Sequence, residues 1–409
     1  MAAPPDYDLL IIGGGMVGAS LACALAGQPL KIGVVEAVPW KTDEPPSYDD
    51  RGLALSPVSQ RILAGIGLWP QLQAHATPIE HIHVSDQGHF GFTRLDARVL
   101  GYAAFGHVVA GRQLGEALLS KLAAQDNVDL ISPGRIEALQ SQPQHMLARV
   151  AAAGRVERGL SARLLVAADG GGSNTRTLLG VRSREFDYRQ IAVVANVSLA
   201  APHGNTAYER FGPSGPVALL PLGGQRSVAV CVAGSEEASA LLAMGDTEFT
   251  QRLSMCMGHR IGPFLRVGKR HGYPLKLVRA LDQAGPRFAV IGNAAHAIHP
   301  NAAQGLNLGL RDAATLAECL IDACSAGEDP GAYPVLHRYA EMRRTDQRRV
   351  IALSHGLARL FGNDLFPLVI ARDVAMCAID MIPALKRALV RRAMGFGGPL
   401  PRLGRGIPL

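Results

Sequence analysis

The pattern of hydrophobic and polar residues near the start of the chain changes several times within thirty positions. The apolar run DLLII (8–12) is followed by GGGMVG (13–18), the small apolar run ASLACALA (19–26) and IGVVE (32–36). Short apolar runs separated by a glycine-rich turn and a longer apolar segment are typical of a strand, a turn, a helix and a second strand. We therefore predict a β-α-β unit over residues 8–36.

The remaining pattern separates segments that alternate every second residue from segments with a helical period. Residues 40–50 form a polar, proline-rich loop in this interpretation. The alternating segments predict strands near 79–109, 128–150, 155–168 and 288–293, and an antiparallel sheet over 185–235. The helical segments lie near 57–66, 112–125 and 246–258, and from the last strand to about 394.

A complete G-x-G-x-x-G motif occupies the first predicted turn, with Gly13, Gly15 and Gly18. The first glycine permits the tight turn, the second lets a pyrophosphate approach the backbone, and the third allows close packing of helix on strand. The N-terminus of the helix supplies N–H groups and partial positive charge for the phosphates. Glu36 ends the second predicted strand, where an acid binds a ribose hydroxyl. The unit predicts a dinucleotide without a 2′-phosphate, which means FAD or NAD.

Composition narrows the class of protein without choosing a function. The chain has 409 residues, a net charge of +7 and 48% apolar residues, and no apolar run reaches the roughly 18 residues of a membrane-spanning helix. Aromatic residues make up 5%, too few for base-stacking platforms, and no nucleic-acid motif is present. The six scattered cysteines contain no C-x-x-C pair, and the start is acidic and proline-rich. We expect a reduced, cytoplasmic protein without a metal site, a disulfide framework or a nucleic-acid partner.

Two later motifs distinguish FAD from NAD. The segment LLVAADGGGSNTR (164–176) reads as a strand that enters D-G-x-x-S-x-x-R. The segment FAVIGNAAHAIHPNAAQGLNLGLRDA (288–313) reads as a strand, a loop and a helix that begins near Gln304. Together with the first glycine motif, these segments resemble the aromatic-ring flavin hydroxylases built like p-hydroxybenzoate hydroxylase.

Four further segments are similar to the ubiquinone-biosynthesis branch of that family: HVSDQGHFGFTRL (83–95), YERFGPSGPVALLP (208–221), YPL (273–275) and GNAAH (292–296). The likeness extends from about residue 8 to residue 398. It implies an α/β (α+β overall) fold in which a mainly antiparallel substrate domain interrupts a Rossmann-like FAD-binding domain, with helices at the C-terminus. We expect FAD-binding segments at 1–78, 109–184 and 276–330, substrate-domain segments at 79–108 and 185–275, and C-terminal helices with a basic tail at 331–409.

The resemblance also implies a set of cofactor residues. Residues that would hold the ADP half of FAD are Gly13, Gly15, Met16, Val17, Gly18 and Glu36. Arg51 and Arg112 would reach the pyrophosphate and ribityl region, Asp169 and Gly170 would serve FAD and the nicotinamide cofactor, and Asn293 would contact the ribityl chain. Pro300, Gln304, Gly305, Leu306 and Asn307 would pass along the flavin ring. A helix that begins near residue 304 would direct its N-terminus at the edge of the flavin that becomes negative on reduction.

One residue departs from the family pattern. The family has A-G-Q-G in the third motif, whereas this chain has alanine at position 303 before Gln304 and Gly305. If that position requires a positive φ angle, alanine costs on the order of 1 kcal/mol.

Several other residues keep two interpretations open. His296 and His299 structure the loop by hydrogen bonds, or they handle protons near the flavin. The catalytic residues are unknown, and the candidates on the loop at the flavin face are His299, Pro300 and Gln304. Tyr208, Phe211, Leu219 and Pro221 either pack in a core or line a phenol pocket. The cluster Arg343, Arg344, Arg348 and Arg349 is expected on a solvated helix face. No residue is identified as a base.

The resemblance implies an NAD(P)H- and O₂-dependent monooxygenase that hydroxylates a prenylated phenol of the 2-polyprenyl-6-methoxyphenol type through a flavin C4a-hydroperoxide. Only one G-x-G-x-x-G unit is present, so the nicotinamide would bind transiently. The alternatives are hydroxylation at another ring position, a flavin-dependent prenyl reductase that needs no oxygen, and a prenyl-lipid escort protein that is not an enzyme. A flavin halogenase is disfavoured because no W-x-W-x-I-P segment occurs.

The C-terminal region is the expected place for contacts with other molecules. From Lys386 to the end there are six cations and no acid, and the apolar run 366–385 is interrupted by three charged residues. A solvated tail and a helix packed on the protein are one interpretation. A surface that touches a membrane or a ubiquinone-pathway enzyme is the other, and it would place the protein at the inner face of the membrane. The sequence does not indicate an oligomeric state.

Overall fold

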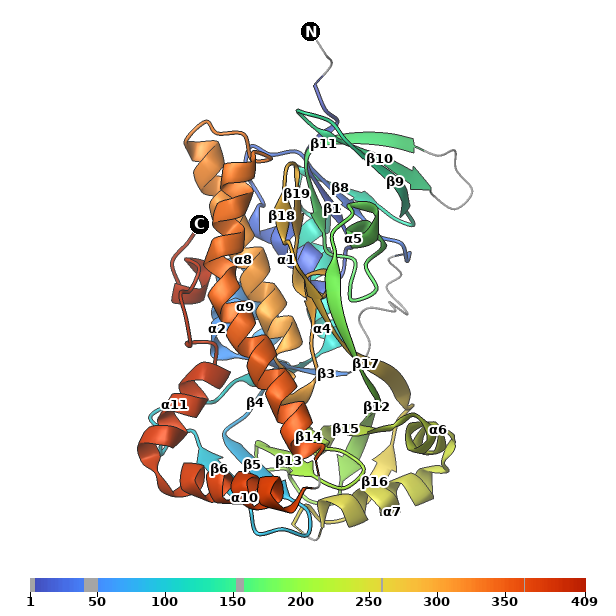
Figure 1. The fold of residues 1–409 in the computed structure, drawn as a ribbon, viewed down its shortest axis with the longest axis vertical. Helices are drawn as coiled ribbons and strands as arrows, with labels where there is room; N and C mark the ends of the chain where they lie inside the picture. The colour runs from blue at the N-terminus through green and yellow to red at the C-terminus, as the bar shows by residue number, and fades with distance from the viewer. Residues whose placement is uncertain (1–3, 40–50, 152–157, 259, 364) are drawn as a thin grey trace.

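The computed structural model describes residues 4–39, 51–151, 158–258, 260–363 and 365–409. The proline-rich loop expected at 40–50 lies outside these residues. Figure 1 shows two sheets, one above the other, joined along one side by a long helix. The mixed α/β fold class expected from the sequence is confirmed.

The upper sheet contains the first β-α-β unit. Its path runs β18-β19-β11-β1-β2-β8, and β10 and β9 extend it from β11. All pairings from β19 to β8 are parallel, whereas β9, β10 and β18 pair antiparallel. The strands are β1 (Tyr7–Ile12), β2 (Ile32–Val35), β8 (Val128–Ile131), β9 (Arg135–Ser141), β10 (Met146–Ala151), β11 (Arg158–Ala167), β18 (Ala284–Gly285) and β19 (Phe288–Val290).

Alternate side chains of β1 enter two different cores, so this sheet is covered on both faces. Leu9 and Ile11 point into a core of helices, whereas Leu10 and Ile12 point into a core formed with β9 and β10. A strand that is buried on both sides reads as a continuous apolar run, which is the pattern of residues 8–12. The helices of the first core are α1 (Met16–Ala24), α2 (Pro57–Gly65), α3 (Trp69–Gln73), α4 (Gly111–Ala123), α8 (Gly305–Ser325) and α9 (Tyr333–Phe361).

The lower sheet is mainly antiparallel, with the path β20-β17-β12-β15-β14-β13-β5-β6 and β16 beside β12. Only β13 and β5 pair in parallel, and this pairing brings residues 81–96 beside residues 206–211. The strands are β5 (His81–Asp86), β6 (Phe92–Asp96), β12 (Ser183–Leu199), β13 (Thr206–Phe211), β14 (Val217–Leu222), β15 (Arg226–Gly234), β16 (Phe264–Val267), β17 (His271–Ala280) and β20 (His296–Ala297).

The two faces of the lower sheet meet different neighbours. Its outer face packs against α6 (Ser235–Ala243) and α7 (Asp246–Met257). Its inner face packs against Ala54 and Val108 of a small sheet, formed by β3 (Gly52–Leu55), β7 (His107–Ala110) and β4 (Thr77–Pro78), and against α11 (Pro383–Ala393). A Cβ at Gly52 would lie 2.5 Å from Val228 of β15, so glycine allows this close approach. The inner face is therefore the one turned toward the upper sheet.

The segment from residue 333 to residue 409 connects the two halves. Helix α9 runs along one side from the upper to the lower sheet, and α10 (Phe366–Met381) and α11 cover the end of the lower sheet (Figure 1). The chain then returns to the upper half, where Leu403 is buried beside Gly65 and Arg402 pairs with Glu318 and Asp322. The expectation of a solvated tail is therefore wrong for residues 402–403. Among the described residues, no helix is long and apolar enough to span a membrane.

Candidate functional site

The three sequence motifs converge at one edge of the upper sheet. Each motif residue comes one or two positions after a strand ends. Gly13 follows β1 and Glu36 follows β2, while Asp169 follows β11 and Gly292 follows β19. These strands are parallel neighbours, so their carboxyl ends lie side by side. Ligands of open α/β sheets bind in the crevice outside those ends.

The geometry of the first motif leaves room for a ligand at one position only. Gly13 has φ +105°, and a Cβ there would lie 2.5 Å from the Ala168 carbonyl oxygen. A Cβ at Gly18 would lie 2.0 Å from the Gly13 carbonyl oxygen, so the helix could not pack this closely on the turn. At Gly15 a Cβ would meet no protein atom within 4 Å. The turn is tight and α1 close, while the space beside Gly15 stays open.

Glu36 joins this turn to the second strand. Its Oε2 accepts the Gly14 N–H at 2.8 Å, and its Oε1 accepts the Val38 N–H at 3.0 Å. Gly15 precedes α1 as its N-cap and no described side chain caps the helix. The first turn of α1, which begins with the partly buried Met16 and Val17, therefore keeps N–H groups for an anion.

The second motif is connected internally and to the third. Asp169 accepts hydrogen bonds from the Ser173 hydroxyl and from the Thr175 N–H, the latter at 3.0 Å. The Ser173 Oγ caps helix α5 (Asn174–Leu178) by accepting the Arg176 N–H at 2.9 Å. The buried Arg176 guanidinium donates to the Ala294 carbonyl at 2.8 Å. The side chains of this motif hold loops together, and Gly170, at φ +88°, has open space beside it.

The third motif packs on the first through glycines. Gly292 begins a short 3₁₀ helix, η1 (Gly292–Ala294), and a Cβ there would lie 3.1 Å from Val17. A Cβ at Gly309 of α8 would lie 2.7 Å from Val17. The exposed Asn293 directs its Oδ1 toward Gly305, where a Cβ would lie 3.9 Å away. Asn293 and the start of α8 therefore face the same space.

Ala303 has φ +49°, in the left-handed region that glycine adopts readily. It ends the 3₁₀ turn η2 (Asn301–Ala303), which follows Pro300, and its N–H donates to the Pro300 carbonyl at 2.9 Å. The Asn307 amide holds the Ala303 carbonyl at 2.8 Å. Position 303 therefore does require a positive φ angle, and alanine in place of the family's glycine is strained there.

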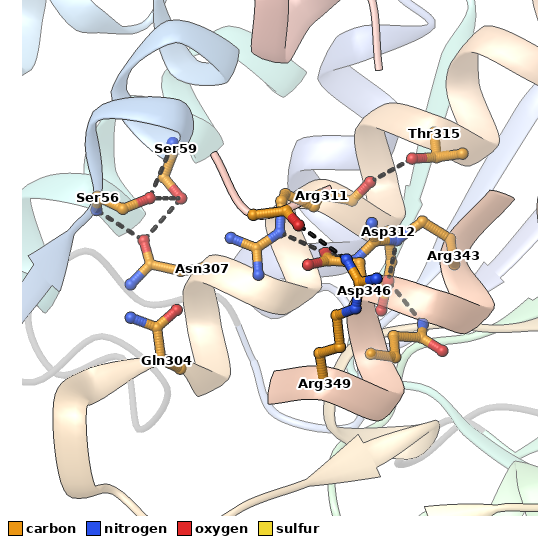
Figure 2. A network of polar contacts seen from close by, with 12 residues as sticks. Ser56, Ser59, Gln304, Asn307, Arg311, Asp312, Thr315, Arg343, Asp346 and Arg349 are labelled. Carbon is orange, nitrogen blue, oxygen red and sulfur yellow. Dashed lines mark hydrogen bonds and ion pairs between the residues drawn. The ribbon is translucent and has the colours of Figure 1, made fainter. Parts of the chain in front are cut away.

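The side chain of Asn307 is fully used inside the protein. Its Oδ1 accepts from the Ser56 N–H and the Ser59 hydroxyl (Figure 2). Its Nδ2 donates to the carbonyls of Ala54 and Ala303. Gln304 donates to the Ala393 carbonyl of α11 at 3.0 Å. Leu306 packs on the helical core. Asn307 and Gln304 therefore shape the loop, and ring contacts from this segment would come from its backbone.

A buried ionic network lies behind the loop (Figure 2). Asp312 accepts from Arg343 at 2.8 Å, from His296 at 2.5 Å and from the Gly292 N–H at 3.1 Å. Arg311 and Arg343 both pair with Asp346 at 2.9 Å. Burial alone would raise the pKa of Asp312, but His296 and Arg343 hold that pKa well below its usual range. The expectation of a solvated arginine face is wrong for Arg343, because its side chain is buried among these partners.

Both loop histidines have structural partners. His296 is buried against Asp312. The Nδ1 of His299 accepts the Asn301 N–H at 3.3 Å, and its ring meets Tyr188 of β12 edge to face at 4.9 Å. Burial lowers the pKa of His299 to about 4, so its ring is neutral at pH 7. These contacts match the loop-structuring interpretation.

Arg51 and Arg112 are neighbours although 61 positions separate them. The Gly111 N–H donates to the Arg51 carbonyl at 2.8 Å, next to the pairing of β3 with β7. The Arg51 guanidinium lies 4.2 Å from the centre of the Tyr273 ring. Arg112, on the first turn of α4, pairs with Glu116 one turn later. Both cations lie where the small sheet meets the upper half.

The proposed phenol-pocket residues lie on different faces. Leu219 is buried in the core with α6 and α7, on the outer face of the lower sheet, and Tyr208 packs beside that core. By strand alternation, Pro221 is on the same face as Leu219. Phe211 is buried and stacks on Phe361 of α9. Leu219 thus follows the core-packing interpretation, and Tyr208 and Glu209 line a cavity of about 430 Å³ beside the end of α7.

Sequence reasoning missed Glu209. It lies between Tyr208 and Arg210, whose side chains turn to the α7 face, so alternation turns Glu209 to the inner face with Ala207. No hydrogen bond or ion pair from the described residues reaches its carboxyl group, which keeps some solvent access. Burial raises the pKa of Glu209 to about 7. In the sequence, Glu209 is a single acid in an alternating strand, and no motif marks it. Only the strand's position in the sheet shows which face it is on.

Comparison with known proteins agrees with this geometry. A family model described as an FAD binding domain matches residues 6–354. The chain belongs to this FAD-binding family. It is 38% identical over 405 residues to a ubiquinone hydroxylase of Rhodospirillum rubrum, covering 98% of this chain and 93% of that protein.

Two further similarities cover nearly the whole chain. The 3-demethoxyubiquinol 3-hydroxylase of Escherichia coli is 31% identical, with 95% of this chain and 98% of that protein covered. The crystal structure of p-nitrophenol 4-monooxygenase from Pseudomonas putida superimposes with a TM-score of 0.78 at 18% identity, covering 95% and 98% of the two chains. At that identity the likeness concerns the fold.

The residues at the site suit the FAD of this family. The open side of Gly15 and the uncapped start of α1 suit the pyrophosphate, and Glu36 lies where the ribose would be. Asn293 and the start of α8 face one space, which suits the ribityl chain and the flavin ring. The cations Arg51 and Arg112 would complement the phosphates.

We predict that replacing Ala303 with glycine stabilises the protein by about 1 kcal/mol, because glycine relieves the positive φ at this position. The urea midpoint of the FAD-free and FAD-loaded protein measures the change. Ala375→Gly on an exposed part of α10 is the control and should lower stability by a similar amount. A loss of stability in both variants would contradict the strain at Ala303.

We predict that Arg343→Met lowers the free energy of unfolding by about 3–5 kcal/mol, because it leaves Asp312 buried without its guanidinium partner. The neighbouring Arg344 forms an exposed pair with Glu341, so Arg344→Met should cost less than about 1 kcal/mol. Urea unfolding followed by circular dichroism compares the two variants. Equal effects would mean that the buried network contributes no more than a surface pair.

Proposed function

We propose that this protein is an FAD-dependent monooxygenase that hydroxylates the ring of a prenylated phenol of the 2-polyprenyl-6-methoxyphenol type in ubiquinone biosynthesis. The observation that carries the proposal is the meeting of all three flavin motifs at one sheet edge, in a chain similar over its whole length to ubiquinone hydroxylases. The E. coli relative is named for hydroxylation at position 3, so other ring positions remain alternatives.

FAD, when bound and reduced by NAD(P)H, supplies the activation of O₂ that ring hydroxylation requires. The protein's own residues bind and orient: Gly13, Gly15, Gly18 and Glu36 hold the ADP half, and the start of α8 stabilises negative charge at the flavin edge. With one glycine-rich unit in the chain, the nicotinamide binds transiently. The inner face of the lower sheet, covered by the small sheet and α11, excludes water from the phenol.

Glu209 is the proton acceptor of this proposal. A phenolate ring is richer in electrons than a phenol and is therefore hydroxylated more readily. Strand alternation assigns Glu209 to the inner face, and the residue also lines the cavity of about 430 Å³. Its carboxyl group is unpaired among the described residues and takes the phenol proton on an Oε atom. A pKa of about 7 is close to the working pH, where a general base is most effective.

Oxygen and NAD(P)H consumption by purified FAD-loaded protein, with and without a short-chain 2-prenyl-6-methoxyphenol, tests the function. We expect consumption that depends on the phenol and a product heavier by one oxygen atom from O₂. NAD(P)H oxidation with prenyl-chain reduction and no oxygen transfer would favour the reductase. A protein that binds the prenylphenol but takes up no FAD would favour the escort protein.

We predict that Glu209→Gln lowers turnover at pH 7.5 by about 100-fold and removes the rise in turnover between pH 6 and pH 8. The carboxylate form that accepts the proton predominates only above pH 7, so turnover in the unmodified protein rises through that pH. The exposed Glu248→Gln serves as the control. A variant with an unchanged pH profile would contradict the role of Glu209.

The same substitution has a readout in stability. The folded protein binds the Glu209 proton more tightly than the unfolded chain does, because the pKa is raised from 4.5. Stability therefore falls as pH rises from about 4.5 through 7. The difference in unfolding free energy between the unmodified protein and Glu209→Gln should change over this range, and a constant difference would contradict the raised pKa.

A further inference from the structure

Helix α10 is attached to the lower sheet by one side only. The Thr93 hydroxyl of β6 donates to the Met376 carbonyl at 2.8 Å, and the Arg94 N–H donates to Asp380 at 2.8 Å. Arg372 pairs with the buried Asp86 at 2.7 Å. The polar groups of α10 are thus directed toward the protein. The buried residues on this side are Val369, Arg372, Asp373 and Met376.

The opposite side of α10 is exposed and apolar throughout. Phe366, Ile370 and Val374 follow one another at intervals of four residues, with side chains 74%, 40% and 53% exposed, and Met381 is 79% exposed. Every exposed residue of α10 is apolar. We call this surface the α10 face. It comprises Phe366, Leu368, Ile370, Val374, Met381, Ile382 and Leu385.

Cations border the α10 face on α11. Arg387, Arg391 and Arg392 are exposed, and within residues 365–409 the acids are Asp373 and Asp380. Asp373 is buried, and Asp380 is neutralised by Lys386 at 3.1 Å. In Figure 1, α10 lies at the end of the molecule opposite the upper sheet, and α11 rises from it along one side. The surface is therefore apolar in its middle and positive at its border.

We infer that the α10 face docks on the surface of an anionic lipid bilayer. A helix that buries an apolar side at the headgroup boundary, with cations beside it, gains from both apolar burial and attraction to acidic lipids. The exposed residues of α10 and α11 include three arginines and no acid, which complements the charge of an acidic lipid surface. In this orientation α10 lies along the lipid surface, with β6 on its protein side.

The inference does not depend on the proposed function, because docking needs only lipid. Flotation measures the binding of the full-length, FAD-loaded protein to phosphatidylcholine vesicles. The vesicles are prepared without and with phosphatidylglycerol at roughly 30%, an anionic share that gives a negative surface potential. We expect binding to the anionic vesicles that weakens with salt. The double variant Val374→Gln with Met381→Gln should reduce the partition coefficient at least about 10-fold. Arg391→Gln with Arg392→Gln should reduce it roughly 25-fold.

Matched controls separate docking from general surface effects. Met255 of α7 is 67% exposed outside the α10 face, so Met255→Gln should leave vesicle binding unchanged. Replacing the exposed Arg344 and Arg348 of α9 with glutamine controls for charge. The flavin spectrum confirms that each variant is folded. Equal losses in variants and controls, or no binding to anionic vesicles, would overturn the inference. So would self-association in light scattering that only the α10 variants abolish.

Discussion

The carboxylate of Asp312 is the interaction on which the site depends. It lies on α8, yet it binds the Gly292 N–H after β19, His296 of the third motif and Arg343 of α9. One buried charge therefore connects the loop of the third motif, the helix that follows it and the helix that joins the two halves. Breaking one partner of such a group leaves a buried charge without compensation, which is costly. The loop between β19 and α8 is tied to both helices because this anion accepts from several donors.

A second constraint is the division of the lower sheet into an outer and an inner face. The outer face is closed by α6 and α7, and the inner face meets the small sheet and α11. Alternation along β13 places Glu209 on the inner face and its neighbours on the outer one. The proposed substrate region and the supporting helices α6 and α7 are thus separated by the thickness of a single sheet, and each strand contributes to both faces.

The C-terminal segment combines three structural roles. Helix α9 supplies Arg343 and Asp346 to the buried network, α11 receives Gln304 at its last carbonyl, and Leu403 returns to the helices of the upper half. Helices α10 and α11 are also the exposed apolar and basic part of the molecule. The Gln304 side chain is bonded to the last carbonyl of α11, whose first turn carries Leu385 of the α10 face. A displacement of α11 at a lipid surface would act directly on Gln304.

The sequence by itself determined the β-α-β unit, the three flavin motifs and the start of α8 to within one residue, because these depend on local periodicity and on glycines with steric roles. It also identified Ala303 as the unusual position. Only the tertiary structure decided that Arg343 is buried, that Leu219 faces α7, that Arg51 and Arg112 are neighbours and that Glu209 points inward. These properties depend on which distant segment covers each side chain, and a charged residue on a helix reads the same whether its partner is water or a buried carboxylate.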